Sequence, residues 1–289
     1  MAGIAWVNGR LLAPEEAAIS VLNRGFLYGE GLFETMRAYR GRVFRLRQHL
    51  ERLGEGAGEL DLRPPGPGLL TEAVNEAIAG SGLEEATVRL SVTPGLAGSS
   101  PTPTVVVLVR PLTLPPAERY SRGCRAVCVP AAQAAGTPLR RVKSLNYLDK
   151  LLAQRAAADA GADEAILVDP DGSVVEGAMR NVFAVMQSEL VTPPASRGLL
   201  PGITRQAVLE VAERLDMRQG ERDIRSAELS GAEECFLTSS IAEILPVASV
   251  DGRPMPAPVP GPKTRALTEG YRRLVAEELG LGEIGNGSG

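Results

Sequence analysis

A lysine that precedes a helical pattern has the clearest potential for chemistry in this sequence. Lys143 stands within residues 141–150, which read Arg-Val-Lys-Ser-Leu-Asn-Tyr-Leu-Asp-Lys. An Ala/Leu-rich helix is predicted from about Leu145 to Ala160. Apolar residues at three- and four-residue steps predict its buried face, made by Leu148, Leu151, Leu152 and Ala156. A lysine in the turn before such a helix can point into a pocket between layers. The alternative is a solvated lysine in a basic loop with Arg140 and Arg141.

The other reactive residue types leave few routes to catalysis. His49 is the single histidine, so a Ser–His or Cys–His hydrolase would depend on it and a zinc site would lack imidazoles. Because His49 lies in an amphipathic helical pattern, we expect a structural role for it. No Gly-x-Ser-x-Gly elbow or Walker phosphate loop occurs, and no metal site is expected. Acid–base chemistry therefore falls to Lys, Tyr, carboxylates or a cofactor.

Length and composition indicate a globular protein of two domains. A chain of 289 residues is long for one hydrophobic core. The net charge of −4 argues against a nucleic-acid partner, and no apolar run approaches the roughly 20 residues that span a bilayer. Residues 1–8 lack a secretory signal, and the three cysteines, Cys124, Cys128 and Cys235, do not resemble a disulfide framework. These features predict a cytoplasmic protein.

Local patterns predict many strands and several helices. Asn8-Gly9 predicts a hairpin over residues 4–12. Further strands are predicted at 32–39, 42–44, 86–93, 104–110, 126–129, 165–169, 174–176, 181–186, 189–192, 234–238 and 247–250, and helices at 46–57, 68–80, 204–217 and 262–279. The Pro-rich stretch at 111–116 predicts a boundary, with an N-terminal α/β domain (1–111), a linker (112–117) and a C-terminal domain (118–289). Residues 94–101 are expected to form a loop, and the tail 285–289 to be disordered.

Four spaced motifs occur together in this chain: residues 24–37, Lys143 to Tyr147, Glu176-Gly177 followed by 181–183, and 200–205. Because these motifs occur in the order found in the fold-type IV, or class IV, PLP-dependent aminotransferase family, the chain resembles its members. That family contains branched-chain aminotransferases, D-amino-acid aminotransferases and 4-amino-4-deoxychorismate lyases. The resemblance covers nearly the whole chain. It implies pyridoxal 5'-phosphate (PLP) as cofactor and an α/β (α+β type), two-domain, D-amino-acid-aminotransferase-like fold. The small N-terminal α/β domain would be followed by a larger C-terminal PLP-binding domain with a pseudo-barrel of strands.

The resemblance assigns three residues to the main parts of the cofactor. Lys143 aligns with the lysine that holds PLP as a Schiff base, and a buried amine near other cations can be neutral, as a nucleophile and proton carrier needs. Glu176 aligns with the carboxylate that keeps the pyridine nitrogen protonated. Arg52 aligns with the phosphate-binding arginine. The alternatives are an exposed glutamate at a strand end and an arginine paired with a neighbouring Glu.

Further cofactor contacts are implied for Tyr147, Leu200, Gly202, Ile203, Thr204, Ser239 and Ser240. Gly202-Ile203-Thr204 opens a predicted helix, where free N–H groups and the helix dipole favour an anion. The two serines follow a predicted strand and align with a region that adds a hydroxyl to the phosphate shell. Tyr147 and Leu200 align with residues beside the cofactor ring, although either could belong to the core.

Three arginines are candidates for holding a substrate carboxylate, for which arginine is the usual residue. Arg37 and Arg89 match arginines of the branched-chain enzymes, although the tyrosine expected two residues before Arg89 is Thr87. Arg180 stands where small residues are more common. Together they suggest an anionic substrate, and the alternative is that each is paired at the surface. The remaining implied substrate contacts are Tyr28 and Ile241.

Different motifs point to different members of the family and therefore to different substrates. The Arg-x-His carboxylate trap of D-amino-acid enzymes is absent, because Pro94-Gly95-Leu96 follows Val92-Thr93, and the branched-chain glycine–methionine loop is missing as well. The Lys-Ser-Leu-Asn-Tyr form looks closer to the lyases and D-type enzymes. The pattern around Glu243 looks like that of the aminotransferases.

We therefore predict a PLP-dependent aminotransferase that transfers an amino group between an amino acid, of the D- or branched-chain type, and a 2-oxo acid by a ping-pong mechanism. The alternatives are a 4-amino-4-deoxychorismate lyase that releases pyruvate with the same cofactor, and a non-catalytic binding relative. The resemblance also implies a homodimer with a pocket between the two domains. Residues near Tyr28 to Arg37 would reach the neighbouring subunit's site. No nucleic-acid or membrane partner is expected.

Overall fold

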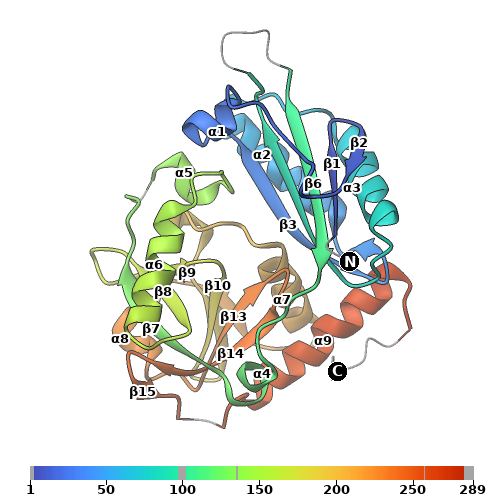
Figure 1. The fold of residues 1–289 in the computed structure, drawn as a ribbon. Helices are drawn as coiled ribbons and strands as arrows, with labels where there is room; N and C mark the ends of the chain where they lie inside the picture. The colour runs from blue at the N-terminus through green and yellow to red at the C-terminus, as the bar shows by residue number, and fades with distance from the viewer. Residues whose placement is uncertain (1–2, 97–101, 135, 257, 283–289) are drawn as a thin grey trace. The chain divides into compact units, whose positions relative to one another are not determined.

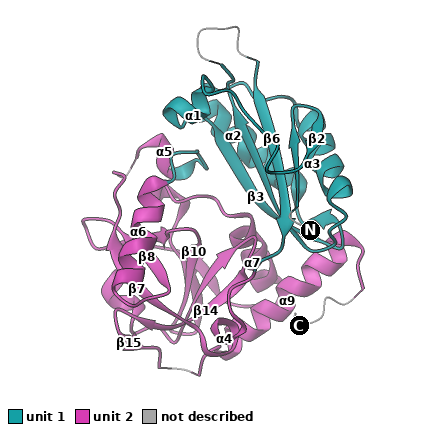
Figure 2. Cartoon of the chain, viewed as in Figure 1, with its two compact units in different colours: residues 1–113, 141–147 teal, residues 114–140, 148–289 magenta. Residues whose placement is uncertain are grey.

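The computed structural model describes residues 3–96, 102–134, 136–256 and 258–282. Most of the loop expected at 94–101 and the tail at 285–289 lie outside the described residues. The chain divides into two compact units (Figure 2): residues 1–113 with 141–147 form unit 1, and residues 114–140 with 148–289 form unit 2. The sequence placed segment 141–147 with the second half of the chain, whereas in the structure it groups with unit 1.

Unit 1 is built on a sheet whose described strands follow the order β2-β1-β6-β5-β3-β4, with antiparallel neighbours (Figure 1). The strands are β1 (Ile4–Val7), β2 (Arg10–Leu12), β3 (Leu32–Tyr39), β4 (Arg42–Val43), β5 (Ala86–Thr93) and β6 (Thr104–Pro111). The helices are α1 (Arg24–Tyr28), α2 (Leu46–Glu59) and α3 (Pro67–Ser81). Apart from the short α1, these elements confirm the predicted ones to within two residues.

Alternation along the strands separates the two faces of this sheet. Met36, Val88 and Leu90 are fully buried in a core that also contains residues of α2 and α3. On β5 the intervening residues, including Arg89, are only partly buried. The face with Met36, Val88 and Leu90 is therefore the one that packs on the helices, and the other face carries Arg89 together with Phe33.

The segment around Lys143 is extended and pairs with the start of β3. The Phe33 N–H donates to the Lys143 carbonyl oxygen at 2.9 Å, and the Leu145 N–H donates to the Gly31 carbonyl oxygen at 2.9 Å. Leu32 and Ser144 form an antiparallel bridge between these bonds. The backbone at Lys143 is therefore fixed by β3 and not by a helix.

Unit 2 contains a larger sheet, in the order β12-β11-β10-β13-β14-β7-β8-β9 with β15 beside β14. Its strands are β7 (Cys124–Pro130), β8 (Glu164–Val168), β9 (Val174–Gly177), β10 (Asn181–Met186), β11 (Glu189–Thr192), β12 (Gln219–Glu221), β13 (Glu234–Ser239), β14 (Glu243–Val250) and β15 (Arg253–Pro254). Because the edge strand β9 also contacts β10 in the middle of the sheet, the sheet curls, as expected for a pseudo-barrel.

The helices of unit 2 are α4 (Ala117–Arg122), α5 (Pro138–Arg141, ending in unit 1), α6 (Leu148–Asp159), α7 (Ile203–Arg214), α8 (Ser226–Leu229) and α9 (Pro262–Leu279), with a 3-10 turn at Ala195–Arg197. The last predicted helix is confirmed residue for residue. Strand β14 begins four residues before the predicted 247. No described helix has the length and apolar character needed to cross a membrane.

The predicted start and buried face of the helix after Lys143 were both wrong. Helix α6 begins at Leu148, because pairing with β3 holds the preceding residues extended. Leu148, Leu151 and Leu152 are 62%, 40% and 51% exposed, and the buried residues are Ala153 and Ala157. Helix α6 contacts β7 and β8, and small alanines allow the close approach that leucines would prevent.

Candidate active site

The amine of Lys143 lies against aromatic rings in unit 1. Its Nζ atom is 4.5 Å from the centroid of the Phe33 ring and 5.2 Å from that of Tyr147. The two rings meet edge to face with centroids 5.1 Å apart. Two aromatic faces attract a cation and limit its contact with water. Lys143 is partly buried, so its amine lies beside the two rings with limited exposure to water.

Arg89 contacts the same Phe33 ring. Its Cζ atom is 3.7 Å from the ring centroid, so Phe33 carries two cationic neighbours. Burial lowers the pKa of Arg89, and the nearby Tyr147 acts in the opposite direction. Lys143, Tyr147 and Arg89 are thus brought together around one phenyl ring, and the grouping is cationic.

A second buried group joins β3 to α2. Arg52 Nε donates to Glu34 Oε1 at 2.9 Å, and Arg52 Nη2 donates to Glu34 Oε2 at 2.5 Å. His49 Nδ1 lies 2.7 Å from Glu34 Oε2. The exposed fractions of the Glu34, His49 and Arg52 side chains are 0%, 1% and 9%. One carboxylate therefore holds both side chains that α2 presents at positions 49 and 52.

The charges of this group follow from its burial and geometry. Burial alone would raise the pKa of Glu34, but Arg52 and His49 outweigh it and lower that pKa to about 2. Burial lowers the pKa of His49; Glu34 opposes this, and the positive charges of Arg52 and Lys143 reinforce it. At neutral pH Glu34 is therefore ionised and His49 is neutral, and its Nδ1–H donates to the carboxylate.

Arg37 and Tyr28 lie elsewhere in unit 1. The Arg37 guanidinium is 3.3 Å from the Glu85 carboxylate and stacks over the Tyr39 ring at 4.3 Å. Tyr28 ends α1 and is 62% exposed, with Arg24 over its ring. Both residues have neighbours other than the Lys143 group.

In unit 2, Glu176 is a buried carboxylate at the end of the curled sheet. Its side chain is 4% exposed, and Oε1 accepts from Lys150 Nζ at 2.5 Å. Its Oε2 accepts from the Leu200 N–H at 3.2 Å. The exposed strand-end glutamate considered from the sequence is therefore wrong, and Leu200 is held beside Glu176 through its backbone.

The start of α7 is shaped by a glycine. A Cβ atom on Gly202 would lie 1.9 Å from Asn181 Oδ1, and Asn181 Nδ2 donates to the Leu200 carbonyl at 3.0 Å. Only glycine fits without moving Asn181. No side chain caps α7, and Ile203 and Thr204 are buried in its first turn. The helix thus begins with N–H groups that can receive an anion.

Arg180 belongs to a network beside β13. Its Nη2 donates to Glu164 Oε1 at 2.9 Å and its Nη1 donates to Ser239 Oγ at 2.8 Å. The Ser239 hydroxyl also accepts from the Ala242 N–H at 3.2 Å, across the turn that contains Ser240 and Ile241. Arg180 is therefore an internal residue with a fixed guanidinium, and surface pairing does not describe it.

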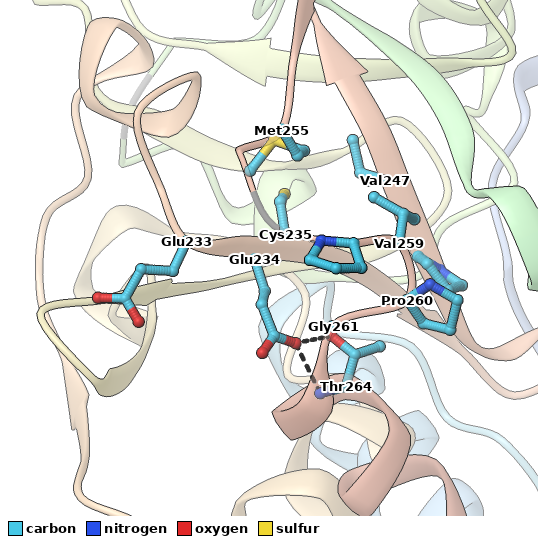
Figure 3. A pocket seen from close by; sticks show the side chains of 11 residues that line it. Glu233, Glu234, Cys235, Val247, Met255, Val259, Pro260, Gly261 and Thr264 are labelled. Atoms are coloured by element: carbon cyan, nitrogen blue, oxygen red, sulfur yellow. Dashed lines mark hydrogen bonds between the residues drawn. The ribbon is translucent and has the colours of Figure 1, made fainter.

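A small pocket at the other end of β13 has a structural explanation. Glu234 points at the start of α9 (Figure 3), where its carboxylate accepts from the Thr264 N–H at 2.8 Å and from Thr264 Oγ1 at 2.6 Å. The Lys263 N–H donates to the same carboxylate at 3.0 Å. Glu234 therefore caps α9 from a neighbouring strand, and this carboxylate is not available as a catalytic group.

Several residues of these groups were not found from the sequence, namely Glu34, Lys150, Glu164 and Asn181. A signal existed for Glu34, because it precedes a strand-to-helix connection that places His49 and Arg52 three residues apart on one helix face. Asn181 lies in the motif at 181–183 but had no assigned role, and Lys150 and Glu164 carried no comparable signal. Their roles depend on contacts between elements distant in the sequence.

Comparison with known proteins gives the family. A family model described as amino-transferase class IV matches residues 31–250. A putative branched-chain-amino-acid aminotransferase of Methanocaldococcus jannaschii is 36% identical over 277 residues, which cover 93% of this chain and 95% of that protein. A D-alanine aminotransferase of Bacillus licheniformis is 31% identical over 278 residues, covering 94% and 96%. The PLP-bound structure of a hypothetical aminotransferase of Mycobacterium tuberculosis matches with a TM-score of 0.87 at 28% identity, covering 96% of this chain and 100% of that one.

The matches extend over both units, so the fold is the fold-type IV aminotransferase fold that the sequence motifs implied. The chain belongs to the class IV aminotransferase family. These relatives are described as aminotransferases, so the lyase alternative is not favoured. The family is one of enzymes, so the alternative of a non-catalytic binding protein is not favoured either.

Proposed function

We propose that Lys143 is the residue through which this PLP-dependent aminotransferase attaches its cofactor. The observation that carries the proposal is the position of its amine between the Phe33 and Tyr147 rings, on a backbone fixed by β3. A lysine ammonium is readily made neutral by burial and by neighbouring cations, and Arg89 supplies such a cation. The chain has two other lysines, Lys150 and Lys263. Both have contacts of another kind.

The residues of the described units fit a phosphorylated pyridine ring. Glu176 supplies a buried carboxylate for a ring nitrogen. The start of α7 and the buried Thr238 hydroxyl, which has no hydrogen-bond partner in the structure, supply donors in unit 2. Arg52 supplies a guanidinium oriented by Glu34. We propose that Arg52, Thr204 and Ser239 or Ser240 hold the phosphate, and that Leu200 packs on the ring.

When bound, PLP withdraws electrons from the substrate Cα and so makes the Cα–H bond easier to break. The amine of Lys143 would carry the proton that leaves Cα, because it lies over the same phenyl ring as Arg89, the proposed partner of the substrate carboxylate. The buried Glu176 carboxylate would hold a positive charge at the ring nitrogen. Tyr147 would orient the amine through its ring.

The substrates are proposed to be an amino acid and a 2-oxo acid, whose carboxylates would be held by arginine. Arg89 is the strongest candidate, because its guanidinium shares the Phe33 ring with Lys143. Arg180, which is held by Glu164 and Ser239, is the second candidate, and Ile241 follows Ser239 by two residues. The relatives are named for branched-chain amino acids and for D-alanine, so amino acids of both types are candidate substrates. A panel of L- and D-amino acids with 2-oxoglutarate and pyruvate as acceptors separates the two.

We further propose a cytoplasmic homodimer. Around α1 the side chains Val21, Leu22, Phe26, Leu27 and Tyr28, here termed the α1 apolar cluster, are 42–70% exposed. A group of large exposed apolar side chains is typical of an interface. Arg37, on the strand that follows, would then serve the neighbouring subunit. The three cysteines are free thiols, which suits the cytoplasm.

The lysine assignment is tested by reducing the PLP-loaded enzyme with borohydride and locating the modified lysine by peptide mass spectrometry. With three lysines in the chain, the result is unambiguous. We expect modification of Lys143 alone, and loss of both the visible absorbance and transaminase activity in Lys143→Ala. An undiminished visible band in that variant, or modification at another lysine, would refute the assignment. Lys263→Ala, at the start of α9, is the matched control and should behave like the wild type.

A further inference from the structure

Lys150 is the second of the three lysines, and its ammonium is bound to Glu176. The Nζ to Oε1 distance is 2.5 Å, and the side chains are 13% and 4% exposed. The two residues come from the first turn of α6 and from the end of β9. Both elements belong to unit 2, so the contact lies within one compact unit.

The ion pair with Lys150 compensates Glu176 for the hydration that its carboxylate loses on burial. A carboxylate that is only 4% exposed favours its neutral form unless charges or hydrogen bonds compensate the lost hydration. The Leu200 N–H supplies one hydrogen bond at 3.2 Å, and Lys150 supplies the charge. Removing one member of a buried ion pair leaves the other uncompensated. Lys150 is therefore the charged partner that offsets the burial of this carboxylate.

The geometry also leaves Glu176 able to accept another donor. A carboxylate has about four acceptor positions on its two oxygens. Lys150 uses one position on Oε1, and Leu200 uses one on Oε2. These two contacts come from different elements and fix the plane of the carboxylate. An N–H donor arriving at the remaining positions meets a charged, oriented acceptor.

We propose that Lys150 is a positioning residue whose ion pair with Glu176 holds that carboxylate oriented for the ring nitrogen of PLP. This inference rests on the proposed role of Glu176, and it adds a second lysine that acts on the cofactor without a covalent bond. A neutral side chain at position 150 would leave the buried Glu176 carboxylate without its charged partner.

The primary experiment is a PLP titration of the cofactor-free protein between pH 6 and 9, with wild type, Lys150→Met, Lys150→Arg and Lys263→Met. We expect Lys150→Met to bind PLP at least about tenfold more weakly, since a buried charge loses its partner. The pH midpoint of the bound cofactor's absorbance should move as well. Lys150→Arg, which keeps the charge, should recover most of the affinity. Lys263→Met, which removes an ammonium that donates to the Ser188 carbonyl, should match the wild type.

A double-mutant cycle with Glu176→Gln tests whether Lys150 acts through Glu176. In the Glu176→Gln background, Lys150→Met should change PLP affinity less than about twofold, because the charge to be compensated is gone. This double variant also removes both buried charges, so it provides a folded reference if Lys150→Met alone is unstable. Wild-type affinity and an unmoved absorbance midpoint in Lys150→Met would overturn the proposal. Additive effects in the cycle would do the same.

These outcomes are separable from failure of the proposed function. Borohydride modification of Lys143 in the Lys150→Met protein shows that the covalent role of Lys143 stands whatever the titration gives. A purely structural pair would lower the stability of the cofactor-free protein while leaving the affinity of the folded fraction and its absorbance midpoint unchanged. That result counts against the positioning role and leaves the Lys143 assignment intact.

Discussion

The guanidinium of Arg52 and the carboxylate of Glu34 form a two-point contact, with Nε and Nη2 each donating to a different carboxylate oxygen at 2.9 and 2.5 Å. Because two parallel hydrogen bonds fix a planar group more tightly than one, the Arg52 side chain has its orientation set by the protein. An anion that binds Arg52 therefore meets a guanidinium that does not need to be ordered. His49 completes the group by donating to the same carboxylate.

Glu34→Gln should lower the free energy of unfolding by about 3 kcal/mol, since it leaves the buried Arg52 charge without its carboxylate. Denaturant unfolding of the cofactor-free protein measures this. Glu85→Gln is the matched control, because Glu85 pairs with Arg37 but is 46% exposed, and its loss should stay below about 1 kcal/mol. Equal losses in the two variants would show that the Arg52 contact is no stronger than a surface pair.

Acid should destabilise the protein in two stages that follow from Glu34 and His49. The folded-state pKa of Glu34 is lowered from 4.5 to about 2, so its contribution of about 3 kcal/mol is present above pH 4.5 and is lost as the pH falls toward 2. The pKa of His49 is also lowered. Below pH 6.5 the unfolded chain therefore binds a proton at His49 more readily than the folded chain does. The free energy of unfolding consequently also decreases as the pH is lowered through this range.

The His49 stage can be isolated with His49→Gln, measured by unfolding at several pH values between 7 and 5. This variant removes the titrating group, so the dependence of stability on pH should flatten in that interval. The steeper fall below pH 4.5 should remain, because Glu34 is still present. An unchanged slope between pH 7 and 5 would mean that another group causes the first stage.

Gly202→Ala should weaken PLP binding by about tenfold or more and cost about 1–3 kcal/mol of stability, since the new methyl group must displace the Asn181 amide. Asn181 would then lose its hydrogen bond to Leu200. Gly54→Ala is the control, because nothing lies within 4 Å of its Cβ position; in the middle of α2 it should stabilise by about 0.5–1 kcal/mol. PLP titration and thermal unfolding report both effects, and normal PLP affinity in Gly202→Ala would exclude a close approach of the phosphate at this turn.

Arg89→Lys should raise the KM for the amino acid by about tenfold while changing kcat less, because the substituted ammonium cannot make the two-point contact of a guanidinium with a carboxylate. Steady-state kinetics with fixed acceptor concentration measure the split. Arg47→Lys, with a side chain that is 78% exposed, is the control and should leave both constants unchanged. A fall in kcat alone would place Arg89 outside the carboxylate site.

Phe26→Asp should shift the protein from dimer to monomer, since it places a charge in the α1 apolar cluster, where Phe26 is 68% exposed. Sedimentation velocity over a range of concentrations reports the change. Leu69→Asp is the matched control, because Leu69 is an exposed leucine of α3 outside that cluster. If both variants sediment as the wild type does, the α1 apolar cluster is not the dimer interface.

Most elements of the fold could be predicted because their causes are local. Asn8-Gly9 closes the β1–β2 hairpin with both residues in the left-handed region, and the Gly-Pro start of α9 was recognised residue for residue. The helix after Lys143 shows where such prediction ends. Its apolar periodicity is real, but periodicity does not say which side is covered. Contact with β7 and β8 decided that Ala153 and Ala157 face inward and the leucines outward.

The sequence by itself determined which residue types are available for chemistry: three lysines, one histidine, and the spaced motifs that hold Lys143, Glu176 and Arg52. Only the tertiary structure decided their electrostatic state. Glu176 and Lys150 are 26 residues apart, and Glu34 and Arg52 are 18 apart. They meet because separate strands and helices pack together. Burial makes an unpaired charge costly, so the partners that packing supplies decide which groups are charged, and no local pattern records that packing.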